Sequence, residues 1–293
     1  MATAVAAAGP LRARRALTAR ARRHTAPRTA LVVLLCVVSF VVLLPFLWML
    51  SASLHTQGDL SHNPTSLWPA HFTLANYTSI WTVIPFGRQF VNTVVFAGAV
   101  TVLSLILDSM AGYALARFDF RGKNAVFIGI LVTLMLPTQV TLIPVYRLLV
   151  QFNWIDTYQG LIVPRAADAF GIFFVRQFFL AVPTDLEDAA RIDGASELRI
   201  WLRVMMPLAG PALLTIGLFN LLANWNDLLW PLIVSTDTDM ETLPAGLALF
   251  KGQHGTQYGL LMAGAIIALA PMVVAFLCVQ RRFIEGIATT GIK

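Results

Sequence analysis

Charged residues are scarce in this sequence. Only 12% of its 293 residues are charged, whereas 57% are hydrophobic, and the mean hydropathy is +0.72. Soluble globular domains carry about 25% charged residues, so this chain lacks the polar groups needed to cover a water-facing surface. The composition excludes a soluble, disordered or collagen-like chain and predicts an integral membrane protein.

Cysteine is nearly absent. Cys36 and Cys278 are the two cysteines, and both lie in long apolar runs without a CxxC pair. This pattern excludes a disulfide-stapled scaffold and favours small apolar residues within helices.

The sequence motifs of metalloenzymes, hydrolases and ATPases are also missing. No HExxH or GxSxG occurs, and the five histidines are scattered without ligand spacing. A phosphate loop ending at Gly122 and Lys123 would need an earlier glycine where Arg117 stands, and Ser or Thr where Asn124 stands. We therefore expect no metal site, no cofactor and no ATP hydrolysis in this chain.

Long apolar segments dominate the rest of the sequence. A bilayer-spanning helix needs about 20 apolar residues, and the first segment is too long for a cleaved signal peptide. Six segments reach the spanning length, at about 29–51, 89–116, 124–146, 158–182, 205–234 and 258–280. The sequence predicts an all-α, polytopic fold of six transmembrane helices over 29–293, after a basic and disordered tail at 1–28.

The basic residues indicate how these spans are oriented. Sixteen of the 21 Lys and Arg residues lie in the tail, in the loops after the second and fourth spans, and at the C-terminal end. The positive-inside rule places those segments in the cytoplasm, together with both termini. The arginine-rich tail lies beside an apolar segment, which favours contact with anionic lipid over nucleic-acid binding.

The loop at 183–207 carries unusually regular helix signals. Thr184 and Glu187 have capping-box spacing, and Gly194 stands where a left-handed C-cap favours glycine. Ser196 is then placed to cap a second short helix, which Pro207 would end. Two readings remain open: an ordinary amphipathic surface helix, or a helix that fits into a groove of another protein.

The same loop resembles the EAA loop of ABC-importer permeases. The family pattern is E-A-A, three residues, G, nine residues and I-x-L-P, and this chain has Asp188-Ala189-Ala190, Gly194, Val204 and Met206-Pro207 at those places. Segments 113–123, 136–146 and 225–233 further resemble the shorter six-span permease of maltose-type carbohydrate transporters. The end of the chain, 286–293, follows the family only loosely.

This resemblance implies a type I ABC-importer permease fold with divided labour. It implies a second homologous permease, two ATPase subunits that bind ATP and Mg²⁺, and an extracytoplasmic solute-binding protein. It also implies that the loop couples this chain to the ATPases. The expected coupling residues are Glu187, Asp188, Ala189, Ala190, Asp193, Gly194, Ala195 and Pro207.

Polar residues within the spans are candidates for the solute pathway. Asp108 either lines the pathway or pairs with a basic residue of another span. A group in the fifth span has the amides, carboxylate and aromatic rings that bind sugars, or that bond helices together. Its members are Asn220, Asn224, Trp225, Asn226, Asp227 and Trp230. For Arg165 and Arg176 we expect snorkelling or pairing with Asp168.

The sequence thus predicts a permease subunit for a sugar or sugar-like solute in a bacterial cytoplasmic membrane. A glycerol-phosphate-type solute is the alternative within the family. A membrane-embedded enzyme is the alternative from another class, and internal symmetry expected of an ion-coupled secondary transporter is not evident.

Overall fold

The computed structural model describes the backbone of residues 10–252 and 255–290, and the side chains of 28–251 and 256–280. The elements in chain order are α1 (Pro10–Ser53), α2 (Gln57–His62), α3 (Ala75–Val83), α4 (Phe86–Arg117), α5 (Lys123–Leu134), α6 (Thr138–Gln151), α7 (Tyr158–Ile162), η1 (Val163–Arg165), α8 (Ala169–Ala181), α9 (Asp185–Ile192), α10 (Glu197–Ile200), η2 (Trp201–Met205), α11 (Met206–Leu208), α12 (Gly210–Trp225), α13 (Leu229–Val234), α14 (Leu243–Ala248), β1 (Lys251–Gly252), β2 (Gly255–Thr256) and α15 (Tyr258–Thr290).

The predicted all-α class is confirmed. Over the described residues the chain is helical apart from turns and a two-stranded antiparallel ribbon, in which Lys251 pairs with Thr256. Three helical segments are long and apolar enough to cross a membrane: 28–53, α4 and 258–280. The number reaches six when each of three sharply bent helix pairs is taken as one span.

The third, fourth and fifth predicted spans are not single straight helices, and this corrects the expectation. The third is split at Pro137 into α5 and α6, which meet at 102°. The fourth is interrupted between η1 and α8, because Asp168 caps a new helix by accepting the Gly171 N–H at 3.3 Å. The fifth begins only at Gly210 and breaks again after Trp225.

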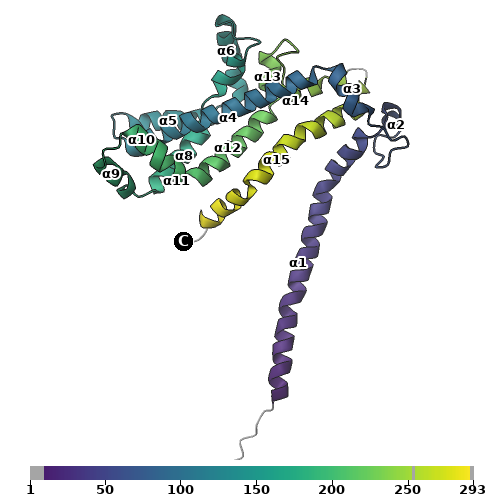
Figure 1. The fold of residues 1–293 in the computed structure, drawn as a ribbon, viewed down its shortest axis with the longest axis horizontal. Helices are drawn as coiled ribbons and strands as arrows, with labels where there is room; N and C mark the ends of the chain where they lie inside the picture. Colours follow the sequence, from purple (N-terminus) through teal and green to yellow (C-terminus); the bar gives the residue numbers. More distant parts are fainter. Residues whose placement is uncertain (1–9, 253–254, 291–293) are drawn as a thin grey trace, which may run out of the picture.

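The centre of the molecule is α4, which packs along both α8 and α12 (Figure 1). Close approach to α8 is possible because α8 carries Gly171, where an added Cβ would lie 2.2 Å from the Asp108 carboxylate. One apolar cluster joins the C-terminal end of α4 to α8 and the α9–α12 segment. A second joins the N-terminal end of α4 to α3, α14 and α15.

The first span leans away from the rest of the molecule (Figure 1). It packs mainly against α15, with hydrogen bonds to α3 near its C-terminal end, and its apolar side chains from Leu31 to Leu43 are about half exposed. Such a surface requires lipid or another membrane helix around it. α1 begins at Pro10, within the predicted basic tail, but side chains before Arg28 lie outside the described residues, so the predicted disorder at 1–28 stays a prediction.

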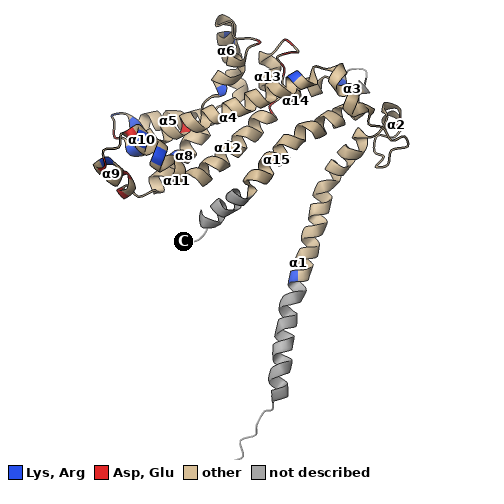
Figure 2. Cartoon of the chain, in the orientation of Figure 1, with Lys and Arg blue, Asp and Glu red and all other residues tan. Residues whose placement is uncertain are grey.

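Charged side chains gather at one end of the molecule. Figure 2 shows them around α8 to α11, whereas most of α4, most of α12 and the described part of α15 carry none. This charged end contains the loop at 183–207, and the sequence expectation makes it the cytoplasmic end.

Candidate coupling loop and membrane cavities

The loop at 183–207 forms a helix, a sharp turn and a second helix. α9 ends in the left-handed turn predicted at Gly194, whose φ is +79°. The Ala195 N–H donates to the Ala190 carbonyl at 2.9 Å, and the Gly194 N–H donates to the Arg191 carbonyl at 3.0 Å. This pair of bonds is the Schellman arrangement, which fixes the direction in which the chain leaves α9.

Three details of the predicted loop are wrong. Thr184 makes no side-chain cap, so there is no capping box with Glu187. Ser196 occupies the N-cap position of α10 without a side-chain cap bond. Pro207 does not end the second helix, because the helical stretch from Glu197 passes through it to Leu208 and bends by 81° before Gly210.

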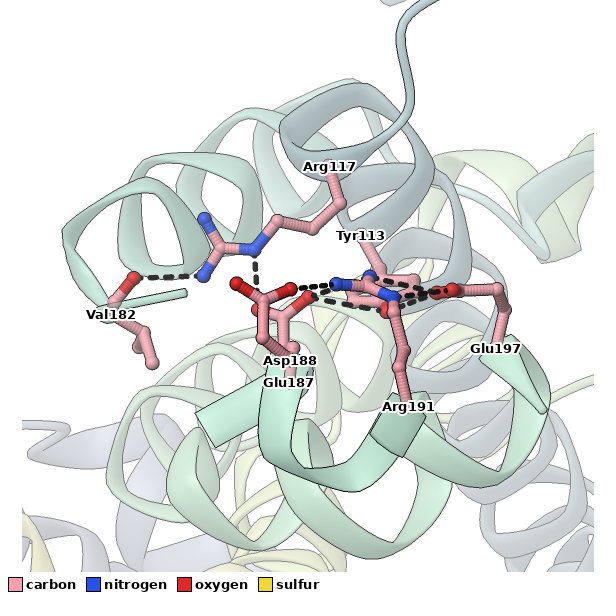
Figure 3. Close-up of polar contacts among 7 residues, drawn as sticks. All are labelled: Tyr113, Arg117, Val182, Glu187, Asp188, Arg191 and Glu197. Carbon is pink, nitrogen blue, oxygen red and sulfur yellow. Dashed lines mark hydrogen bonds and ion pairs between the residues drawn. The ribbon is translucent and has the colours of Figure 1, made fainter. Parts of the chain in front are cut away.

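Glu187 does not form the expected capping box with Thr184. It is instead the buried centre of a polar network (Figure 3). Its carboxylate is fully buried and accepts a bond from Arg117 Nε at 2.5 Å. The Arg117 Nη2 also donates to the Val182 carbonyl at 2.8 Å, where α8 ends. Arg117 is the last residue of α4, so one guanidinium ties together the ends of α4 and α8 and the first turn of α9.

A second guanidinium organises the outer part of this network. Arg191 bonds Asp188 Oδ1 and Glu197 Oε1, both at 2.8 Å, and so links α9 to α10 across the turn (Figure 3). Tyr113 donates to Glu197 Oε2 at 2.8 Å. The bond from Arg191 holds the pKa of Glu197 below its usual value, so the carboxylate stays charged in the folded loop.

The two alanines of the loop differ in their surroundings. Ala190, one of the expected coupling residues, is half-buried and packs with Ala195 against the apolar cluster of this chain. Ala189 is exposed, as are Asp188 and Asp193. Leu186 is 48% and Ile192 86% exposed on the same short helix. The outward apolar face is therefore formed by Leu186, Ala189 and Ile192, and this corrects the placement of Ala190.

Two cavities, each with a mostly apolar lining and a few polar groups, lie between α6, η1 and the fifth predicted span. The first, of about 410 Å³, is lined in part by Arg165, Asp168, Asn220 and Asn224. The second, of about 350 Å³, is lined in part by Arg165, Asp227 and Trp230. Thr138, Pro164 and Arg165 line both cavities.

Four of the seven predicted pathway residues therefore border a cavity: Asn220, Asn224, Asp227 and Trp230. The other three line neither cavity. Trp225 Nε1 donates to the Ala268 carbonyl of α15 at 3.1 Å. Asn226 donates to the Leu222 carbonyl of its own helix and is exposed. Asp108 is buried against α8 and lines neither cavity.

The charged residues of the spans pair differently from the expectation. Arg165 forms its ion pair with Asp227, not with Asp168. Asp108 pairs with no basic side chain of the described chain and accepts the Asp168 backbone N–H at 2.9 Å through Oδ1. Arg176 donates to the Leu115 carbonyl at 3.2 Å and stacks 3.9 Å from the centre of the Phe127 ring.

Sequence reasoning missed Tyr113, Arg117, Arg191 and Glu197 as members of the loop network. The signal available was a basic residue at the end of a span, Arg117, and acidic residues in the loop at 183–207. Opposite charges at equal membrane depth indicate possible pairing, but the sequence does not show which elements end side by side.

The chain is similar to known transport proteins. Residues 108–288 match the family described as binding-protein-dependent transport system inner membrane component. The chain is 37% identical to the arabinooligosaccharides transport system permease protein AraQ of Halalkalibacterium halodurans, over 87% of this chain and 93% of that protein. It is 34% identical to the diacetylchitobiose uptake system permease protein NgcG of Streptomyces coelicolor, over 94% and 91%.

A solved structure has the same fold. The crystal structure of a bacterial ABC transporter involved in the import of the acidic polysaccharide alginate covers 90% of this chain and 98% of the matched chain, with 24% identity and a TM-score of 0.77. The chain belongs to the family of binding-protein-dependent transport system inner membrane components. The predicted type I ABC-importer permease fold is confirmed, and the chain's homologues are sugar-importer permease subunits.

Proposed function

We propose that this chain is one permease subunit of an ATP-binding-cassette importer for a sugar or sugar-like solute. The observation that carries the proposal is family membership across 108–288, a region that contains both the coupling loop and the two cavities. Relatives named for arabinooligosaccharides and diacetylchitobiose support a carbohydrate as the solute.

In this proposal the ATPase subunits bind the outward face of α9. Leu186, Ala189 and Ile192 give that face apolar side chains that a groove of a partner would bury. The acidic residues Asp188 and Asp193 flank it. The buried Arg117–Glu187 pair then carries displacement of α9 to the ends of α4 and α8, so that a rigid-body movement of the ATPases moves the spans.

The solute pathway in this chain follows the two cavities around Arg165. Asn220, Asn224 and Asp227 supply hydrogen-bonding groups, and Trp230 supplies an aromatic ring. Sugars bind through such amides, carboxylates and ring faces. A second homologous permease completes the pathway, and its helices together with lipid cover the exposed face of α1.

The remaining parts of the proposal concern what other chains supply. ATP and Mg²⁺ bind in the two partner ATPase subunits, and this chain has no cofactor and no enzymatic activity of its own. An extracytoplasmic solute-binding protein delivers the solute. The chain spans the bacterial cytoplasmic membrane several times, with both termini in the cytoplasm, and binds no nucleic acid.

The test is reconstitution of the complete importer, identified by co-purification with this chain, into liposomes. Uptake of a labelled oligosaccharide should require ATP on the side of α9 and loaded binding protein on the other side. The isolated chain should release phosphate from ATP only at background rate. Ion-gradient-driven uptake by the chain alone, or ATP turnover free of ATPase subunits, would contradict the proposal.

A further inference from the structure

We infer that the cavity wall of this chain carries excess negative charge and selects against anionic solutes, so that the solute is a neutral sugar and not a phosphate or a uronate. The inference rests on the proposed function, because it takes the two cavities around Arg165 as part of the solute pathway.

The position of Arg165 is the first step. It lines both cavities, and its guanidinium pairs with Asp227. Its Nε is buried without a hydrogen-bond partner. The guanidinium also lies 6.0 Å from the centre of the Trp230 ring, which holds it against the wall. Its single positive charge is therefore already matched by a carboxylate before any solute enters.

The balance of charge is the second step. The charged residues that line the two cavities are one guanidinium, Arg165, and two carboxylates, Asp168 and Asp227. Asp168 also attracts Arg165 but forms no ion pair within the described chain. Asp108 lies behind Asp168 and lines neither cavity, so its charge is not counted in this balance. Among the residues whose side chains the structure describes, no second basic side chain lines either cavity to reverse this sign.

The consequence for the solute follows from elementary electrostatics. Charges interact more strongly near a low-dielectric wall than in water, so a phosphate or carboxylate is repelled by the excess carboxylate. Pores that pass anions are lined by Arg or Lys in excess. A neutral sugar avoids this repulsion, because its hydroxyls donate to carboxylates and accept from the guanidinium and from the amides of Asn220 and Asn224.

The experiment measures the sign of the potential in the cavity directly. In the complete reconstituted importer, Cys36 and Cys278 are replaced by serine and Thr138, which lines both cavities, is replaced by cysteine. Reaction rates with cationic trimethylammonium and anionic sulfonate methanethiosulfonate reagents are each divided by the rate with a free thiol in solution. We expect the cationic reagent to react about tenfold faster at Thr138→Cys.

Three further variants test whether the cation preference arises from the charged residues of the cavity wall. Thr82→Cys, on the exposed side of α3, is the control site, because α3 contains no Asp, Glu, Lys or Arg. Asp168→Asn removes a charge but keeps an oxygen that caps α8, and it should reduce the cation preference several-fold. Arg165→Gln should increase the preference.

Several outcomes overturn the inference. Equal rates, a preference for the anionic reagent, or no reaction in any nucleotide state would each do so at Thr138→Cys. An unchanged ratio in Asp168→Asn would also overturn it. Should that variant fail to assemble, raising the salt concentration in the parent must reduce the cation preference, since salt screens accessible charges. Loss of sugar uptake speaks against the proposed function, whereas the reagent ratio tests the charge of the wall independently.

Discussion

Two groups of charged residues differ in how completely their hydrogen-bonding atoms are used. Around Glu187, at the charged end of the molecule, Arg117 and Arg191 each bond several acceptors, and Glu187 itself is fully buried. Around Arg165, within the spans, Arg165 Nε and Asp108 Oδ2 are buried without partners, and two cavities lie beside the guanidinium. In the sequence the two groups look alike, because each consists of charged residues within or next to apolar segments.

The difference indicates distinct roles. A buried ion pair resists separation, because removing one partner leaves the other charge poorly compensated. Such a group suits the transfer of displacement between helices. A charged group beside a cavity, with free hydrogen-bonding capacity, can exchange partners with a passing solute. The following predictions test this contrast, beginning with the largest expected effect.

Breaking the Arg117–Glu187 pair should produce the largest loss of stability. Arg117→Met removes the closest partner of the buried Glu187 and leaves it only longer contacts, 3.5 Å to Arg191 Nη2 and 3.4 Å to the Tyr113 hydroxyl. We expect it to lower the free energy of unfolding by about 3 kcal/mol. The double variant Arg117→Met/Glu187→Leu removes both charges and should recover most of that loss. Thermal unfolding of the detergent-solubilised importer, with stimulated ATPase activity measured in parallel, checks both variants.

The exposed pair of Lys123 and Asp119 is the control, since its atoms are 3.5 Å apart and Asp119 is fully exposed. Asp119→Ala should change the stability by less than about 1 kcal/mol. Equal effects of Asp119→Ala and Arg117→Met would contradict the structural role given to the buried pair.

Gly194→Val should cost about 1–2 kcal/mol through the backbone alone. The φ of +79° disfavours a β-branched residue, whereas no heavy atom lies within 4 Å of an added Cβ. Gly194→Asn should be tolerated better, because asparagine adopts left-handed conformations. The measurement is ATPase stimulation by loaded binding protein, together with retention of ATPase subunits.

Gly129→Val in α5 is the matched control for Gly194→Val, because Gly129 also has open space around it but no positive φ. If both valine variants lowered coupling equally, the turn after α9 would not be the cause.

Substitutions at the two alanines should separate docking from folding. Ala189→Arg adds a long side chain to the outward face of α9 and should weaken binding of the ATPase subunits on the order of tenfold, or ~1.4 kcal/mol. Ala190→Arg points into the chain's own apolar cluster and should instead lower thermal stability. Pull-down titrations with purified ATPase subunits and unfolding curves measure the two effects. Normal thermal stability of Ala190→Arg would contradict the inward placement.

Several features of the fold could be predicted from sequence, and the failures have physical causes. Spans without internal breaks, such as α4, were placed correctly because hydropathy reports burial in lipid. The bends at Pro137, Asp168 and Gly210 are not predicted from the sequence, because hydropathy along a chain does not indicate where a helix changes direction. The turn at Gly194 was predictable, since glycine there has a local backbone cause.

The side-chain pairings of the candidate sites were less predictable. The sequence marks Asp227 as a pathway candidate, but its partner Arg165 lies 62 residues away in sequence. The aromatic ring of Trp225 makes it a candidate too, yet its indole bonds α15. The type of a residue determines which hydrogen bonds or ring contacts it can make. The packing of the helices determines whether its side chain faces a cavity or bonds a neighbouring carbonyl.

The smallest expected effect concerns two asparagines two positions apart. Asn224 and Asn226 each donate to the carbonyl four residues earlier at 2.8 Å, and Asn224 also donates to Asn220 Oδ1 at 2.9 Å. Asn224 borders the first cavity, whereas Asn226 borders neither cavity. Asn224→Ala should weaken equilibrium binding of labelled sugar to the nucleotide-bound importer roughly fivefold, about 1 kcal/mol, and Asn226→Ala should change it less than about twofold. Equal losses in both variants would indicate a helix effect, and a larger loss in Asn226→Ala would place the sugar on the other side of this helix.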